Sequence, residues 1–178
     1  MNNSNDIRVQ IGDTDGPVTK HPIVLVLDNL RSAFNVGNLF RLADVCGVER
    51  IVTCGYTATP PHPKLAKTAL GTDKVVAFEH FETSIEAVRS LKQEGYQMVG
   101  IETVEGAENI WDVALQFPVA FVLGNEALGV EKDALKECDV IAKLPVFGRK
   151  NSLNVANCAA AVLYTAIQQI LAQGGPRR

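Results

Sequence analysis

The side chains best suited to chemistry in this sequence are gathered in three polar segments that each contain glycine. Asn35–Arg41 (NVGNLFR) offers two amides and an arginine, and Gly124–Gly129 (GNEALG) offers an amide and a carboxylate. Gly148–Asn154 (GRKNSLN) offers two cations, two amides and a hydroxyl. Arginine and lysine can contact phosphate, whereas amides and hydroxyls give oriented hydrogen bonds. These three segments are therefore the candidate functional regions.

The middle segment has the outline of a phosphate-binding loop, but it lacks the lysine that such a loop requires. Val130 and Glu131 stand where lysine and serine or threonine would be needed. Glu126, within the segment, would repel a phosphate group. A dinucleotide-binding GxGxxG is also missing after the first expected strand. The segment favours a neutral or cationic ligand, and a simple glycine-rich turn is the alternative.

The first and third segments could each begin a helix. Asn35 could cap the free amides of a first turn, and Gly37 would let a ligand or another backbone approach closely. Arg41 should then lie on the exposed side of this helix, either as a substrate contact or as an ordinary surface arginine. In the third segment, Asn151 or Ser152 could cap the final helix.

Asn154 is the residue that capping does not explain. It stands between Leu153 and Val155, in the expected first turn of the final helix and near the expected core. A buried amide needs hydrogen-bond partners. Backbone groups and a ligand are the available candidates.

Short apolar runs alternate with helical patterns along the chain, which predicts an α/β fold with a parallel sheet covered by helices on both faces. In such a sheet, ligands bind at the carboxyl ends of the strands, and the three polar segments follow strand ends. The expected strands span residues 21–29, 49–55, 74–81, 97–103, 118–125 and 139–145, and the expected helices span 36–47, 61–71, 82–96, 131–139 and 152–173.

The composition is that of one globular domain. The chain has 178 residues, 47% of them hydrophobic and 21% charged, with a net charge of −3. We expect a flexible arm over 1–20, one domain over 21–174 and a disordered tail over 175–178. No apolar run approaches the roughly 18–20 residues that a membrane-spanning helix requires. The polar N-terminus is not a secretory signal. The scattered cysteines (Cys46, Cys54, Cys138, Cys158) predict buried free thiols in a reducing cytoplasm, and no histidine has the spacing of a metal site.

The three segments together resemble the motifs of the SpoU/TrmH group of SPOUT-class RNA methyltransferases. The matching pieces are Asn35–Arg41, Phe121–Gly129, and Leu144–Gly148 with Ser152–Val155, and the resemblance runs from about Pro22 to Ala172. It implies S-adenosylmethionine as methyl donor and a ribose 2′-hydroxyl of structured RNA as acceptor. It also implies a homodimer, and a C-terminal deep trefoil knot that ordinary topological rules would not predict.

The resemblance implies roles for individual residues as well. Arg41 would act near the transferred methyl group and the RNA, either as an anchor for phosphate or as the base itself, together with Asn35, Ser152 and Asn154. Arg149 and Lys150 would meet RNA phosphate at the rim. The bent cofactor would be held by backbone around Leu123, Gly124, Ile141, Leu144 and Leu153, with Glu126 in its loop.

Other interpretations stay open at this point. Transfer RNA is the favoured substrate and ribosomal RNA is possible. A non-catalytic RNA-binding or assembly protein would use the same scaffold without cofactor, and a flavodoxin-like enzyme acting on small molecules would need no basic rim. Trp111 could stack a base, although packing beneath a connecting loop is expected.

Overall fold

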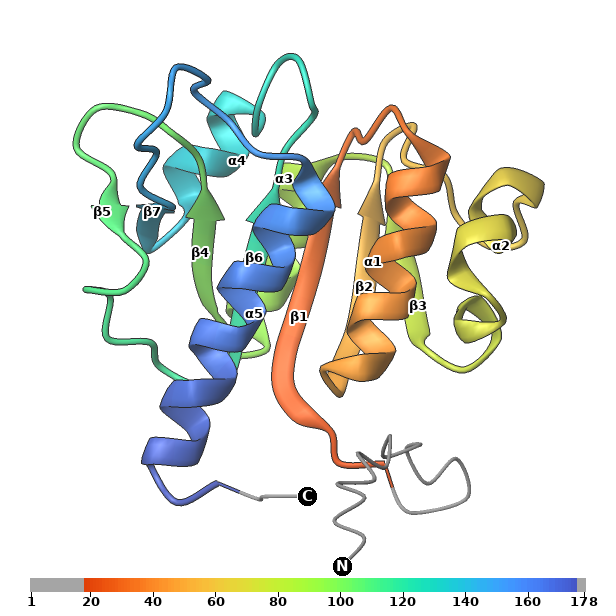
Figure 1. Ribbon diagram of the computed structural model, residues 1–178, viewed down its shortest axis with the longest axis horizontal. Helices are drawn as coiled ribbons and strands as arrows, with labels where there is room; N and C mark the ends of the chain where they lie inside the picture. The colour runs from red at the N-terminus through yellow and green to blue at the C-terminus, as the bar shows by residue number, and fades with distance from the viewer. Residues whose placement is uncertain (1–17, 176–178) are drawn as a thin grey trace, which may run out of the picture.

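The computed structural model describes residues 18–175, which form one seven-stranded parallel sheet (Figure 1). The strand order is β3-β2-β1-β6-β4-β7-β5. All neighbouring pairs are parallel, so the carboxyl ends of the strands share one edge. The strands are β1 (His21–Asp28), β2 (Val48–Cys54), β3 (Ala77–Phe81), β4 (Gln97–Ile101), β5 (Glu108–Asn109), β6 (Val119–Leu123) and β7 (Val140–Lys143).

Helices cover both faces of the sheet, as the continuous apolar strands predict. Ile23, Leu25 and Leu27 of β1 belong to one buried cluster, and Val24 and Val26 belong to the other. The first cluster packs against α1 (Ala33–Val45), α2 (Pro63–Ala69) and α5 (Val155–Ala172), and the second packs against α3 (Ser84–Gln93) and α4 (Lys132–Glu137).

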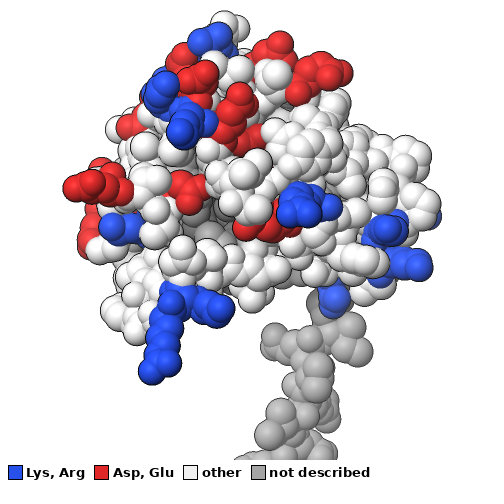
Figure 2. All heavy atoms as spheres, turned by 90° about the horizontal axis from the view of Figure 1, so that it is seen from above, with Lys and Arg blue, Asp and Glu red and all other residues white. Residues whose placement is uncertain are grey.

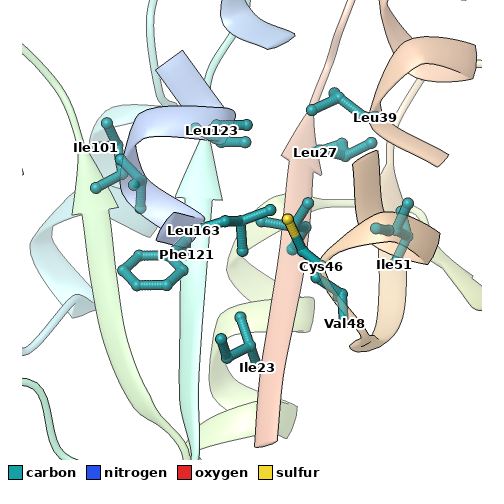
Figure 3. Packing of buried hydrophobic residues seen from close by; sticks show 14 of the residues in the cluster. Ile23, Leu27, Leu39, Cys46, Val48, Ile51, Ile101, Phe121, Leu123 and Leu163 are labelled. Carbon is teal, nitrogen blue, oxygen red and sulfur yellow. The ribbon is translucent and has the colours of Figure 1, made fainter. Parts of the chain in front are cut away.

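The larger core lies between the sheet and α1 and α5. Figure 3 shows Leu39 of α1 and Leu163 of α5 beside Leu27 of β1 and Phe121 of β6, and all four side chains are fully buried. Burying such side chains contributes about 1.5–3 kcal/mol each. This packing holds the beginnings of both helices at the carboxyl edge of the sheet.

The predicted strands and helices are all present, with shifted bounds. The third strand begins at Ala77 and not at Lys74, because a short 3₁₀-helix (Thr72–Lys74) precedes it. The two-residue strand β5 was not predicted. Trp111 is 61% exposed, so the expectation that it packs beneath a loop was wrong.

The capping predictions for α1 and α5 were wrong in detail. Helix α1 begins earlier than predicted, and its cap is Ser32, whose hydroxyl oxygen accepts from the N–H of Asn35 at 3.2 Å. Helix α5 begins later than predicted, and its cap is Asn154, whose side-chain oxygen accepts from the N–H of Ala156 at 3.0 Å. Asn35 and Asn151 therefore do not cap these helices, and neither does Ser152.

Helix α5 also corrects the sequence-based view of apolar runs. Its 18 residues have a mean hydropathy of 1.4, so by length and composition it could cross a membrane. Such a helix is equally typical of a protein core, and Val162, Leu163 and Ala166 of α5 are fully buried against the sheet. One third of the helix is buried. The remainder leaves an accessible apolar side.

Three predictions about the chain's course go untested. The strand order does not establish threading, so the trefoil knot stays a prediction. Residues 1–17 of the predicted arm and 176–178 of the predicted tail lie outside the described residues.

Candidate functional site

Loops that follow neighbouring strands surround a cavity of about 520 Å³ at the carboxyl edge of the sheet. They follow β4, β6 and β7, and the turn that ends in α1 lies beside them after β1. The lining residues are Ile101, Glu102, Thr103, Leu123, Gly124, Asn125, Glu126, Ala127, Gly129, Lys143, Leu144, Val146, Asn151, Ser152, Leu153, Asn154, Val155 and Cys158.

The β6–α4 loop is a tight turn closed on itself. Asn125 and Gly129 exchange two backbone hydrogen bonds, of 3.0 and 2.9 Å. Gly129 has a φ of 73°, which favours glycine. A Cβ at Gly124 would overlap the backbone of Gly129 and Val130. Both glycines are therefore needed for the turn itself, and both line the cavity.

Glu126 joins this loop to the beginning of α1. Its Oε2 accepts from the N–H of Arg31 at 2.9 Å, and its Oε1 accepts from Nδ2 of Asn35 at 2.9 Å. Partial burial alone would raise the pKa of Glu126, but these hydrogen bonds outweigh burial and lower it. Glu126 is therefore ionised at neutral pH, and both of its oxygens accept hydrogen bonds from uncharged groups, which leave the negative charge in place.

Asn35 extends the same network to α5. Its Oδ1 accepts from Nδ2 of Asn154 at 3.2 Å, so one chain of hydrogen bonds runs from Glu126 through Asn35 to Asn154. Each residue comes from a different one of the three polar segments. The prediction that Asn154 is a buried amide was wrong, because its side chain is exposed and its partners are Asn35 and Ala156.

The cavity includes most of the predicted cofactor-binding residues. Leu123, Gly124, Glu126, Leu144 and Leu153 all line it. Ile141 lies within β7 and is not a lining residue. The three leucines supply apolar surface, and backbone groups of the loops supply donors and acceptors. Polar and apolar side chains both line the cavity, and its volume lies within the range of about 300–1,000 Å³ that is typical of small-molecule sites.

The other predicted residues are divided between the cavity and its surroundings. Ser152 and Asn154 line it, whereas Asn35 reaches it through Glu126. Arg41 is exposed on α1, and no hydrogen bond or ion pair joins it to another residue within 18–175. Arg149 and Lys150 are exposed immediately before the lining residues Asn151 and Ser152. No ion pair within the described residues 18–175 involves either cation.

Figure 2 shows this edge of the molecule from above. Acidic side chains gather mainly in the upper and left part of the view, and cations with few carboxylates occupy the lower and right part. A net charge of −3 therefore coexists with a locally basic surface, which is all that phosphate contact requires.

Glu102 is a cavity residue that sequence reasoning missed. It directly follows β4, and its carboxylate accepts from the N–H groups of Thr103 (2.9 Å) and Val130 (3.0 Å). Strand β4 lies between β6 and β7, so the rule that ligands bind at strand carboxyl ends could have identified Glu102. Lys143, which ends the neighbouring strand β7, also lines the cavity.

Cysteines and metal ligands contribute little to this site. Cys158 lines the cavity, and burial first, with the charge of Glu102 second, raises the pKa of its thiol to about 11. All four cysteines are free, but only Cys46 and Cys54 are fully buried, so the prediction of burial was wrong for Cys138 and Cys158. Within residues 18–175, no group of three or more histidine, cysteine or acidic side chains could hold a metal ion.

Comparisons with known proteins point to one family. Residues 22–164 match the SpoU rRNA methylase family. The 23S rRNA (guanosine-2'-O-)-methyltransferase RlmB of Vibrio parahaemolyticus is 31% identical over 162 residues, which are 90% of this chain and 65% of that protein. The chain thus spans slightly less than two thirds of the length of this relative.

Solved structures agree in fold. The SpoU methyltransferase AviRb of Streptomyces viridochromogenes superposes with a TM-score of 0.79 and 25% identity, over 88% of this chain and 63% of that one. A TrmH/SpoU tRNA modifying enzyme of A. aeolicus superposes with a TM-score of 0.80 at 23% identity, over 88% of this chain and 79% of that one.

Proposed function

Because this chain belongs to the SpoU rRNA methylase family, we propose that it transfers a methyl group from S-adenosylmethionine to a ribose 2′-hydroxyl of RNA. The observation that carries the proposal is the hydrogen-bonded chain from Glu126 through Asn35 to Asn154 beside the cavity. It brings the three polar segments to one place. The named activity of the Vibrio parahaemolyticus relative supports the same chemistry.

The cavity fits S-adenosylmethionine better than it fits a nucleotide phosphate. AviRb, which shares 25% identity with this chain, has been solved in complex with AdoMet. Leu123, Leu144 and Leu153 offer an apolar slot for an adenine ring, and loop backbone offers hydrogen bonds to its edge. The carboxylates of Glu102 and Glu126 suit a ligand with positive charge. When bound, the cofactor supplies an electrophilic methyl carbon on a sulfonium.

The protein's remaining task is to orient the ribose hydroxyl and help remove its proton, since a sugar hydroxyl is a poor nucleophile at neutral pH. We assign Arg41 to binding an RNA phosphate next to that hydroxyl, because a guanidinium is protonated at any working pH and makes a poor base. Its positive charge would lower the pKa of the hydroxyl. Ser152 and Asn154 line the cavity and would position the ribose.

Asn35 would act as a positioning residue. It lies in the first turn of α1, six residues before Arg41, and its amide is held at both ends, by Glu126 and by Asn154. The beginning of α1 is thereby fixed relative to the cavity. We propose that this contact sets the distance between the arginine and the reacting hydroxyl.

Arg149 and Lys150 would form the rim that meets the RNA backbone. Each phosphate contact releases counterions, so it steepens the dependence of binding on salt. Replacing both with alanine is expected to weaken RNA binding and to make the slope of log K against log salt shallower by about 1–2. An unchanged affinity and slope would remove these residues from the interface.

Ribosomal RNA is the substrate class we propose first. Curated relatives are named as 23S rRNA methyltransferases, and this moves the proposal away from the transfer RNA that the sequence favoured. RNA modification of this kind takes place in the cytoplasm, where we place the protein. Ribosomal RNA and transfer RNA can be isolated from cells lacking the gene and incubated separately with the purified protein. The RNA class that gains the methyl group is the substrate.

We further propose that the protein works as a homodimer through α5. Ala160, Tyr164, Ile167 and Leu171 follow one another at helical spacing, and none of them is fully buried. A second copy would cover this apolar stripe. Light scattering after gel filtration should give twice the mass of one chain, and Ala161→Arg beside the stripe should reduce it to a monomer.

The proposed function has a direct test in two parts. Titration calorimetry with S-adenosylmethionine measures cofactor binding, and mass spectrometry of RNA nucleosides, from cells with and without the gene, locates the missing ribose methyl group. We expect micromolar binding and the loss of one 2′-O-methylated nucleotide. No binding at millimolar cofactor would favour a non-catalytic RNA-binding protein on this scaffold.

A further inference from the structure

An exposed tyrosine stands fixed beside the cavity without being part of the core. Tyr56 follows β2 at the carboxyl edge of the sheet, and the residue is 61% exposed. Its hydroxyl oxygen accepts a hydrogen bond of 2.6 Å from Nδ2 of Asn125. Asn125 is 5% exposed and lines the cavity. One end of the ring is therefore attached to the cavity wall, and the rest of the ring is free.

The backbone beneath the ring is held equally firmly. The N–H of Tyr56 donates to Oδ1 of Asn29 at 3.2 Å, and a Cβ at Gly55 would overlap this same Asn29 side chain. Gly55 and Asn29 both have positive φ, of 59° and 52°. Thr57, buried next to Tyr56, accepts from the N–H of Leu30 at 2.9 Å. The turn after β2 is thus locked onto the end of β1.

The same amide of Asn125 ties the tyrosine to the reaction site. Its Nδ2 also donates to the backbone oxygen of Asn29 at 2.7 Å, and its Oδ1 accepts from the N–H groups of Ala127 and Leu128. Tyr56 is therefore one hydrogen bond away from the loop that holds Glu126. This arrangement does nothing for the core, because it leaves most of an aromatic residue in water.

A fixed and exposed aromatic ring at this place suits an unpaired RNA base. A ribose can enter the cavity only if its nucleotide leaves the helical stack, so the bases around it lose their neighbours. Stacking on an aromatic side chain replaces them and contributes about 1–3 kcal/mol per base. A ring already held in position loses little conformational entropy on binding.

We infer that Tyr56 is a stacking platform for a base of the RNA substrate beside the methylated ribose. The inference rests on the proposed function, since it assigns a substrate contact to the same site. It concerns RNA recognition and not the chemical step. Tyr56 should therefore act on the affinity for RNA, and both cofactor binding and the rate at saturating RNA should be independent of it.

Three variants test the inference, with Trp111→Ala as the matched control. Tyr56→Ala removes the ring, and Tyr56→Phe keeps the ring but removes the hydrogen bond to Asn125. Trp111 has the same 61% exposure but follows the short strand β5 and is not a lining residue of the cavity. Two readouts are needed: methyl transfer to RNA isolated from cells lacking the gene, and anisotropy of a fluorescent ten-nucleotide oligoadenylate.

Tyr56→Ala is expected to raise both the KM for RNA and the Kd for oligoadenylate about 5- to 150-fold, which corresponds to the loss of one stacked base. Its kcat and its Kd for S-adenosylmethionine should match the wild type. Tyr56→Phe should stay within about threefold of the wild type, because a phenylalanine ring also stacks. Trp111→Ala should leave every value unchanged.

Several results would overturn the inference. An active wild type with unchanged KM and Kd in Tyr56→Ala would show that the ring does not touch RNA, while the proposed function would stand. Equal losses in Tyr56→Phe and Tyr56→Ala would show that only the hydroxyl matters. A changed oligomeric mass in Tyr56→Ala would make the ring a subunit contact. A wild type without methyl transfer would refute the proposed function, and oligoadenylate binding would still test Tyr56.

Discussion

Two polar networks at opposite edges of the sheet differ in how completely they use their charges. At the amino edge, Arg50 makes ion pairs of 2.7 Å with Glu49, 2.7 Å with Glu79 and 2.5 Å with Glu94, and it donates to Tyr96 Oη at 3.1 Å. At the carboxyl edge, Glu126, Asn35 and Asn154 form a chain of single hydrogen bonds. Arg149 and Lys150 remain exposed next to the lining residues Asn151 and Ser152, and Arg41 is exposed on α1 six residues beyond Asn35.

The difference distinguishes a network that stabilises the fold from one that is available to bind a ligand. The Arg50 side chain is only 18% exposed, and burial alone would lower its pKa, but bonds to Glu79 and Glu94 outweigh burial and raise it. Such a group has no capacity left for a ligand. A site for RNA needs the reverse, namely cations and hydroxyls held in place by their backbone while their own polar groups stay free.

The largest effect should come from Arg41, because we assign it to the substrate and no ion pair within residues 18–175 involves its charge. Arg41→Ala is expected to lower methyl transfer by at least about 100-fold, as removal of a group that stabilises developing negative charge commonly does. Cofactor binding and melting temperature should not change. Arg89→Ala, which breaks a surface ion pair to Glu137, serves as the control and should keep full activity. Loss of cofactor binding together with the fold would make Arg41 structural.

Arg50 should show the opposite behaviour. Arg50→Ala leaves three carboxylates without their shared partner, and we expect a loss of about 2 kcal/mol in the free energy of unfolding. Thermal melting should fall by about 4–8 °C for a protein of this size. Methyl transfer measured well below the melting temperature should stay within about threefold. A folded Arg50→Ala protein that fails to bind cofactor would contradict the independence of the two edges.

Asn154 both stabilises the fold, as the cap of α5, and takes part in the candidate site through its contact with Asn35. Two variants can separate these roles. Asn154→Ala removes the cap of α5 and should cost about 1 kcal/mol in the free energy of unfolding. Asn154→Ser keeps an oxygen that can cap but removes the amide that donates to Asn35. We expect the serine variant to regain stability in denaturant titration and to transfer methyl about tenfold more slowly than the wild type. Recovery of both properties would reduce Asn154 to a cap.

The smallest effect should come from Glu126, whose contacts are exposed. Its pKa lies below the ordinary 4.5, so the ionised form adds stability that is complete above this value and is lost as the pH falls through the lower folded-state pKa. Glu126→Gln should cost about 1 kcal/mol or less near neutral pH. Acid titration by circular dichroism should show that the stability of the variant depends less on pH below 4.5 than the stability of the wild type does. If stability depends on pH equally in the variant and the wild type, the loss of stability in acid comes from groups other than Glu126.

Sequence alone determined the architecture and most of the cavity. Continuous apolar runs require burial on two faces, which predicted a parallel sheet, and parallel strands bring their carboxyl ends to one edge. The assignment of Leu123, Gly124, Leu144 and Leu153 to the cofactor came from the family resemblance and not from this rule, and all four residues line the cavity. The resemblance of the three motifs then supplied the family, which composition and periodicity do not contain.

Tertiary structure alone decided which polar groups meet. Asn35 contacts Glu126 across 91 positions and Asn154 across 119, and no local pattern encodes such a pairing. The structure also decided which residues cap the helices. Ser32 and Asn154 are the caps, although the neighbouring Asn35, Asn151 and Ser152 are equally suitable by residue type. Tyr56 carried no signal in the sequence, because exposed and buried tyrosines look alike until Asn125 is seen to hold the hydroxyl. Hydrogen-bond partners depend on distances of a few ångströms, and only packing of the whole chain sets those distances.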